Sequence, residues 1–134
     1  MQVTGDQRKH HTQMSIAEKS AMRSYIDAIP QWTLGNGHMR DRLASKGITD
    51  TEIYRTIAQG HVIEAHANNY PDIRFVIRHE IGNRAICVCA NKQGFVFTAW
   101  SNSAHDNHRT LNRTMYAWKV DLTTVFNRQG QTNA

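Results

Sequence analysis

The chain has 134 residues, of which 40% are apolar and 8% aromatic, enough material for one hydrophobic core but not for two full ones. We therefore expect a single domain over residues 1–134, with flexible ends at 1–14 and 127–134. Lysine and arginine number 16 against 11 aspartate and glutamate, so the balance favours a polyanionic partner. No stretch approaches the roughly 20 apolar residues of a membrane span and no signal peptide is evident, so we expect a cytoplasmic protein with no membrane partner.

The first half of the chain has helical periodicity. Ser15 with Glu18, and Thr49 with Glu52, are capping-box pairs, in which a hydroxyl and a carboxylate each satisfy an unpaired amide at a helix start. Gly47 suits the left-handed position that ends a helix. Together with the spacing of the apolar residues, these signals predict helices over residues 15–29, 38–46 and 50–59.

After residue 60 the period changes from helical to alternating. The pattern predicts strands over residues 61–66, 73–80, 85–90 and 95–100. The third of these is apolar on both faces, so it should be central, and its Cys87 and Cys89 read as small buried side chains rather than a disulfide pair. Residues 117–126 could form either an edge strand or a helix, and we favour the strand because the segment is rich in Val, Leu and Thr. The predicted fold is therefore α+β, with two or three helices packed on an antiparallel meander of about four strands.

A dense polar cluster follows the last predicted strand. The apolar alternation stops after Trp100, and serine, asparagine, histidine, aspartate, arginine and threonine then fill residues 101–110. Polar side chains presented at the end of a buried strand can form a functional site, although a solvated loop has a similar composition.

Two segments of the chain resemble known ribonuclease toxins. The segment HMRDRLASKGITDTEIYRTIAQGHVIE, followed by three strands, is similar to the small domains related to the RelE and MqsR messenger-RNA-cleaving toxins. The segment TAWSNSAHDNHRTLNRTMY is similar to a W-x-N-x-x-x-D-x-H-x-T-L ending of ribonuclease toxin domains in secreted bacterial effectors. The resemblance covers roughly residues 35–116. It implies a RelE/barnase-like sheet with helices on one side, metal-independent and cofactor-independent RNA cleavage, delivery into a target bacterial cell, and a cognate antitoxin or immunity protein.

Metal-independent RNA cleavage needs a base for the 2′-hydroxyl, an acid for the departing 5′-oxygen, and groups that stabilise the phosphorane. Histidine can serve in either proton-transfer role near neutral pH. We expect His108 to do so, with Asp106 or Asn102 orienting it and Thr110 donating a hydrogen bond to phosphate. His38 is the second candidate, because it stands at a helix start where an anion can bind.

RNA would also need cationic and stacking contacts. Arg74 and Arg78 fall on one face of a predicted strand, which favours a joint role in binding. The candidate RNA-binding residues are Arg40, Arg42, Arg74, Arg78, Arg109 and Tyr116.

Three alternatives remain open on the sequence. His105 and His108, joined by His61, His66 or His79, could be assembled into a zinc site, but neither cysteine has ligand spacing and no HExxH pattern occurs, so we predict no metal. A second alternative is an inert module on the same fold that binds RNA or a host protein. A third is a purely protein-interacting role for the polar cluster.

Overall fold

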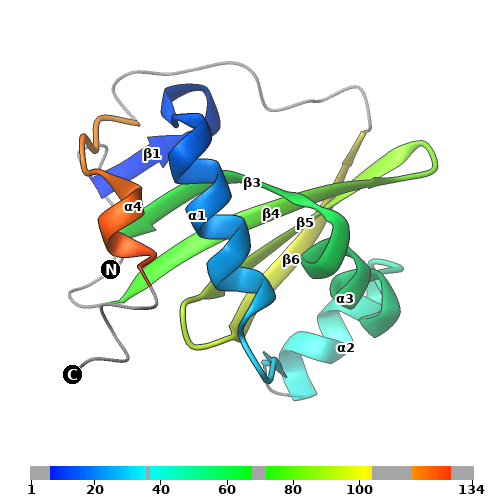
Figure 1. Ribbon diagram of the computed structural model, residues 1–134. Helices are drawn as coiled ribbons and strands as arrows, with labels where there is room; N and C mark the ends of the chain where they lie inside the picture. The colour runs from blue at the N-terminus through cyan, green and yellow to red at the C-terminus, as the bar shows by residue number, and fades with distance from the viewer. Residues whose placement is uncertain (1–6, 36, 68–71, 104–115, 128–134) are drawn as a thin grey trace.

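The computed structural model describes residues 7–35, 37–67, 72–103 and 116–127, and the structural statements below concern these residues. They form a mixed α+β structure in which helices cover one face of a six-stranded sheet (Figure 1). The strands are β1 (Arg8–His10), β2 (Thr33–Leu34), β3 (His61–Ala67), β4 (Ile73–Ile81), β5 (Arg84–Asn91) and β6 (Phe95–Ser103). The helices are α1 (Ile16–Asp27), α2 (Gly37–Ser45), α3 (Asp50–Gln59) and α4 (Leu122–Val125), with a short 3-10 helix η2 (His11–Gln13) before α1.

The three predicted helices are confirmed, together with the signals that predicted them. Ser15 Oγ accepts a hydrogen bond from the Glu18 amide at 3.1 Å, and Glu18 Oε1 accepts one from the Ser15 amide at 2.8 Å. Thr49 and Glu52 form the same reciprocal cap on α3. Gly47 has a φ of +74°, as a left-handed helix end requires. None of the helices in the described ranges is long and apolar enough to cross a membrane.

The sheet contains the predicted antiparallel meander and two further strands. Its strand order is β1-β3-β4-β5-β6-β2, and every neighbouring pair is antiparallel except β2 with β6. The meander from β3 to β6 confirms the four expected strands. The expected total of about four strands was too low, because β1 and β2 have three and two residues and show no alternation in the sequence.

The prediction of a flexible tail over residues 1–14 was wrong for its second half. Arg8 lies opposite His66 and His10 opposite Glu64, so β1 is an edge strand of the sheet. The Arg8 guanidinium contributes to this pairing, since its Nη2 lies 2.6 Å from Glu64 Oε2. A contact between residues so distant in the sequence leaves no local signal.

For the final segment, the favoured of the two predicted alternatives was wrong. Residues 122–125 form a helical turn instead of an edge strand, and residues 116–121 have no regular structure. The Asp121 side chain caps this turn by accepting a hydrogen bond from the Thr123 amide at 3.0 Å. The Leu122 side chain is fully buried and its amide donates to Glu18 Oε2 at 2.9 Å, so tertiary contacts override the local β propensity.

Each face of the sheet has its own apolar cluster. The helices pack over one face, α1 against β3 and α4, α3 against β4 and β5, and α2 against β6 (Figure 1). This main core includes Met22, Ile26, Ile53, Phe75, Ile77, Ile86, Val88, Leu122 and Phe126. The opposite face carries a smaller cluster of Ile63, Val76, Cys87 and Cys89, against which Trp100 packs. Both cysteines are buried and unbonded, as predicted.

Candidate functional site

Most of the predicted catalytic cluster lies outside the described residues. This applies to Asp106, His108, Arg109 and Thr110, and to the side chain of His38, whose backbone belongs to the first turn of α2. Asn102 lies on β6, half-buried, with its amide nitrogen 4.0 Å from Cys87 Sγ. The role assigned to these residues therefore stays a prediction.

Three of the predicted RNA-binding arginines keep access to solvent. Arg40 and Arg42 are exposed on α2, and Arg40 forms an ion pair with Asp50. Arg74 is half-buried on β4, where its guanidinium carbon lies 3.5 Å from the centre of the Phe97 ring. The Arg74 Nε also donates to Asp72 Oδ2 at 2.9 Å.

Two other predicted RNA contacts are corrected by the structure. Arg78 is only 2% exposed, and its Nη1 lies 3.0 Å from Glu80 Oε1. Tyr116 is buried and donates a hydrogen bond to Glu64 Oε1 at 3.3 Å. Burial, followed by the neighbouring Glu64 carboxylate, raises the pKa of Tyr116 to about 12. Neither side chain is presented to solvent, so neither can contact RNA directly in this conformation.

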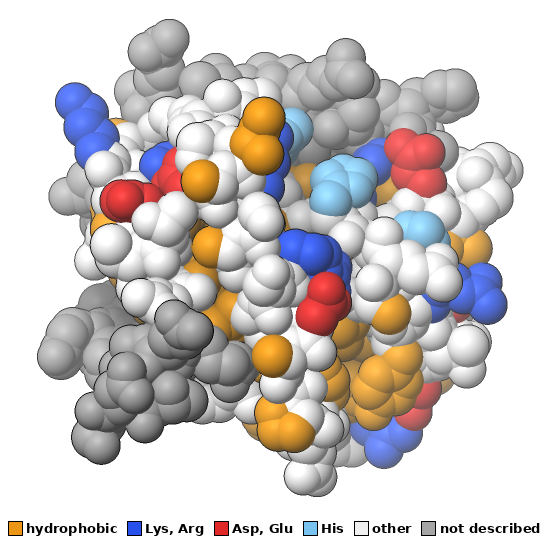
Figure 2. Space-filling model, in the orientation of Figure 1, with side chains coloured by type: hydrophobic (Ala, Val, Ile, Leu, Met, Phe, Trp, Pro, Cys, Tyr) orange, Lys and Arg blue, Asp and Glu red, His pale blue; other side chains and the backbone are white. Residues whose placement is uncertain are grey.

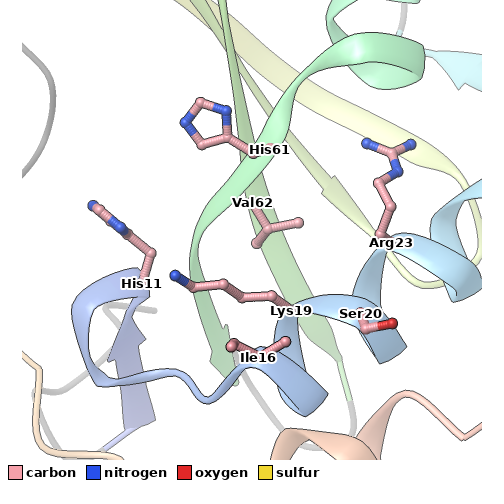
Figure 3. A pocket seen from close by; sticks show the side chains of 7 residues that line it. All are labelled: His11, Ile16, Lys19, Ser20, Arg23, His61 and Val62. Carbon is pink, nitrogen blue, oxygen red and sulfur yellow. The ribbon is translucent and has the colours of Figure 1, made fainter.

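A cavity opens where the short strand β1 ends. β1 pairs only with residues 64–66 of β3, so the first residues of β3 have no β1 partner on that edge. After β1 the chain turns through η2 and enters α1, which leaves a space of about 430 Å³ between η2, α1 and β3. Seven residues line it (Figure 3): His11, Ile16, Lys19, Ser20, Arg23, His61 and Val62. None of these seven is acidic.

Helix α1 supplies four of the lining residues from a single stripe. Ile16, Lys19, Ser20 and Arg23 follow the i, i+3, i+4, i+7 spacing that places side chains on one face of a helix. The buried residues Met22, Tyr25 and Ile26 face the core from another side of the same helix. Helix α1 is therefore amphipathic, with its buried side in the core and its solvent side forming the cationic wall of the cavity.

Strand β3 supplies His61 and Val62 from its first two positions. A β-bulge interrupts the register with β4 between Val62 and Glu64. Bulges re-aim side chains and often occur beside functional sites. His61 lies opposite Arg78, while Val62 lies opposite Ile77, a residue of the main core.

The Arg23 guanidinium fixes the backbone immediately before His61. Its Nη1 donates to the Gly60 carbonyl at 2.9 Å, and its Nη2 donates to the Ile57 carbonyl at 2.6 Å. Its Nε and Nη2 also bind Asp27 Oδ1, at 3.0 and 2.6 Å. These contacts join α1 to the end of α3, so Arg23 holds the two walls of the cavity together.

The electrostatic surroundings favour the neutral form of His61. Its pKa is lowered from the ordinary value of 6.5, first by loss of hydration and then by the positive charges of Arg78 and His11. His79 acts in the same direction and the Glu80 carboxylate opposes it. The imidazole therefore remains an available base at lower pH than an ordinary histidine.

Charged side chains of both signs lie on the face that carries α1. Figure 2 shows histidine, lysine and arginine side chains on this face, with acidic side chains among them. In the close view, the Lys19 side chain extends toward His11, and the His61 ring stands on the neighbouring strand (Figure 3). Two imidazoles and an ammonium group therefore border one space, where an anion would meet favourable charge.

Sequence reasoning missed most of this site. His61 was considered only as a zinc ligand, and His11 was assigned to the flexible tail. The one available signal was on the first helix, where Lys19 and Arg23 are four residues apart and share a face. As for metals, no cluster of three or more histidine, cysteine or acidic residues suited to a metal ion occurs among residues 7–35, 37–67, 72–103 and 116–127.

Comparison with known proteins gives one family match. No curated protein and no solved structure matches the chain. Residues 36–99 match a family model described as a domain of unknown function (DUF4258), a stretch that runs from α2 into β6 and includes His61 and Val62. The match assigns no activity and does not confirm a RelE-like or MqsR-like ribonuclease. The matched stretch follows η2 and α1, which form the other side of the cavity.

Proposed function

We propose that the protein is a metal-independent endoribonuclease and that the cavity between η2, α1 and β3 is its active site. One observation carries this proposal: His11, His61 and Lys19 border a single cavity, and none of its lining residues in the described part of the chain is acidic. Two imidazoles can supply a base and an acid, and an ammonium group can stabilise a developing phosphorane. The resemblance to ribonuclease toxins supports the same activity.

In the proposed reaction, neutral His61 accepts the proton of a ribose 2′-hydroxyl. The 2′-oxygen then attacks the adjacent phosphorus, the bond from phosphorus to the 5′-oxygen breaks, and protonated His11 gives its proton to the leaving oxygen. The Lys19 ammonium group faces the additional negative charge on the phosphorane. The products are a 2′,3′-cyclic phosphate and a 5′-hydroxyl end, and the proposed reaction needs no metal or cofactor.

The assignment of His61 as base follows from its environment. A base must be unprotonated before the reaction, and the lowered pKa of His61 favours that state at neutral pH. Arg23 has a different task, because its donors bind Asp27 and the carbonyls of Ile57 and Gly60. We assign it to positioning the strand that carries His61.

The test is cleavage of a defined RNA oligonucleotide by the purified chain, with and without EDTA. We expect discrete cuts that EDTA does not change, 2′,3′-cyclic phosphate ends, and no cut where a 2′-deoxynucleotide replaces the nucleotide at the cut site. His61→Ala and His11→Ala should each lower the rate about 10²–10⁴-fold.

His66→Ala is a matched control, because His66 is a half-buried histidine of β3 that does not line the cavity. Full activity of both His11→Ala and His61→Ala would remove this cavity from the mechanism. RNA binding without cleavage would instead support an inert binding module on the same fold.

A further inference from the structure

Ile16 has an exposure that the fold does not explain. It is 87% exposed, the largest exposure among the large apolar side chains of the described residues. It stands at the first helical position of α1, directly after the N-cap Ser15, and the capping contacts of Ser15 with Glu18 do not involve its side chain. A single exposed apolar residue is common on protein surfaces, so its exposure alone indicates nothing.

The position of Ile16 relative to the cavity makes the exposure informative. Ile16 belongs to the same α1 stripe as Lys19, and both line the cavity. Val62 lines it from β3 (Figure 3). The cavity therefore combines an apolar wall with cationic groups, the combination that a nucleotide needs, since its base is flat and poorly hydrated and its phosphate is anionic.

Resting on the proposed function, we propose that Ile16 and Val62 form a base-binding wall, so that the site takes a nucleotide unit of an RNA strand rather than a phosphate group alone. The volume of about 430 Å³ lies within the usual range of small-ligand sites, roughly 300–1,000 Å³. A base can reach this wall only when it is unstacked, which favours single-stranded RNA over a duplex.

Contacts of this kind do not distinguish strongly among bases. Ile16 and Val62 offer no hydrogen-bond donor or acceptor on their side chains, so this wall cannot distinguish the polar edges of the bases. Apolar packing against a base is sequence-tolerant. The wall should therefore strengthen the binding of all four ribonucleotides to a similar degree.

Two ligands separate the base contribution from the phosphate contribution. Binding of inorganic phosphate and of ribonucleoside 3′-monophosphates would be measured by calorimetry on the whole chain. Ile16→Ala should weaken nucleotide binding about five- to tenfold and leave phosphate binding unchanged, because it removes three carbons from the apolar wall. Ile16→Val should weaken nucleotide binding less than Ile16→Ala does. Lys19→Ala should weaken both ligands.

Tyr54→Ala is the matched control, because Tyr54 is 46% exposed on α3 and does not line the cavity. It should leave both affinities unchanged. Equal weakening of both ligands by Ile16→Ala, no weakening at all, or absence of nucleotide binding to the unmodified chain would each overturn the inference. Nucleotide binding that depends on Ile16 in a chain that cuts no RNA would support the inference while rejecting the proposed activity.

Discussion

Replacing Glu18 by glutamine should destabilise the protein by roughly 3–5 kcal/mol, because it would leave a buried lysine without its counter-charge. Glu18 is 5% exposed, and its Oε2 lies 2.5 Å from Lys9 Nζ. The same oxygen accepts a hydrogen bond from the Leu122 amide at 2.9 Å, while Oε1 accepts one from the Ser15 amide at 2.8 Å. One carboxylate thus connects β1, α1 and the start of α4.

The expected size follows from which contacts a glutamine can keep. With its carbonyl oxygen at the Ser15 amide, its NH₂ group faces Lys9 and the Leu122 amide, which are donors themselves. The capping contact with Ser15 is then kept and adds little to the loss. Loss of one partner of a buried ion pair costs roughly 3–5 kcal/mol, since the remaining charge stays desolvated. For a domain with a net stability of roughly 5–15 kcal/mol, the variant would be close to unfolding.

Urea denaturation at neutral pH measures this loss directly. Glu52→Gln is the matched control, because Glu52 is the corresponding residue of the other capping box and its side chain is more exposed. We expect at most about 1 kcal/mol for the control, because glutamine keeps the capping box and only the ion pair of Glu52 with the partly exposed Arg84 is lost. The double variant Lys9→Met/Glu18→Leu should recover a large part of the loss, since it removes both charges. Equal losses in Glu18→Gln and Glu52→Gln would refute the buried-pair reasoning.

The same carboxylate should make stability depend on pH in a defined direction. Burial raises the pKa of Glu18, but the hydrogen bonds from Lys9, Ser15 and Leu122 outweigh it and hold the pKa below the ordinary value of 4.5. A lowered pKa in the folded state stabilises the fold above the ordinary value, and this contribution disappears as the pH falls through the folded-state pKa. The gap between the unmodified chain and Glu18→Gln should therefore shrink in acid.

Three further predictions concern the site and the sequence. The acidic limb of the rate profile should lie below pH 6.5, because the pKa of the base His61 is lowered. His79→Ala should move this limb upward, since His79 contributes to the lowering, and a limb above pH 6.5 in the unmodified chain would contradict the assignment. Arg23→Ala should lower kcat far more than it raises KM, because Arg23 positions the strand that carries His61. Arg23→Lys should restore only part of kcat, since lysine cannot bind two carbonyls and Asp27 together. An equal change of kcat and KM in Arg23→Ala would argue against a positioning role. His108→Ala should remove most cleavage at nearly unchanged melting temperature if the predicted polar cluster takes part in the chemistry, and an unimpaired rate would leave the cavity as the whole site.

The fold was readable from the sequence wherever one element carried its own signal. The capping pairs of Ser15 with Glu18 and Thr49 with Glu52 located two helix starts, and Gly47 located a helix end. The alternation after residue 60 located the four meander strands. These signals are local, because each depends on residues within one turn or one strand.

The missed elements depend on partners far away in the chain. Strand β1 is short, and its side chains are held by contacts such as that of Arg8 with Glu64, so a local pattern could not reveal it. The buried turn at Leu122 depends on Glu18, more than a hundred residues earlier. The cavity could not be predicted from local patterns either, since it forms where β1 ends on β3 and the chain turns at His11.

The same long-range contacts explain how the chain tolerates a cluster of cationic groups. His11, Lys19 and His61 border one space and repel one another when protonated, so the cavity works against the compact state. The ion pair of Glu18 with Lys9 ties β1 to the start of α1, one residue before Lys19. The Arg23 contacts tie the end of the same helix to the backbone before His61. Helix α1 is therefore fixed at both ends of the stripe that faces the cavity. The described lining residues hold like charges close together and include no counter-charge, so an anionic ligand would supply the missing negative charge.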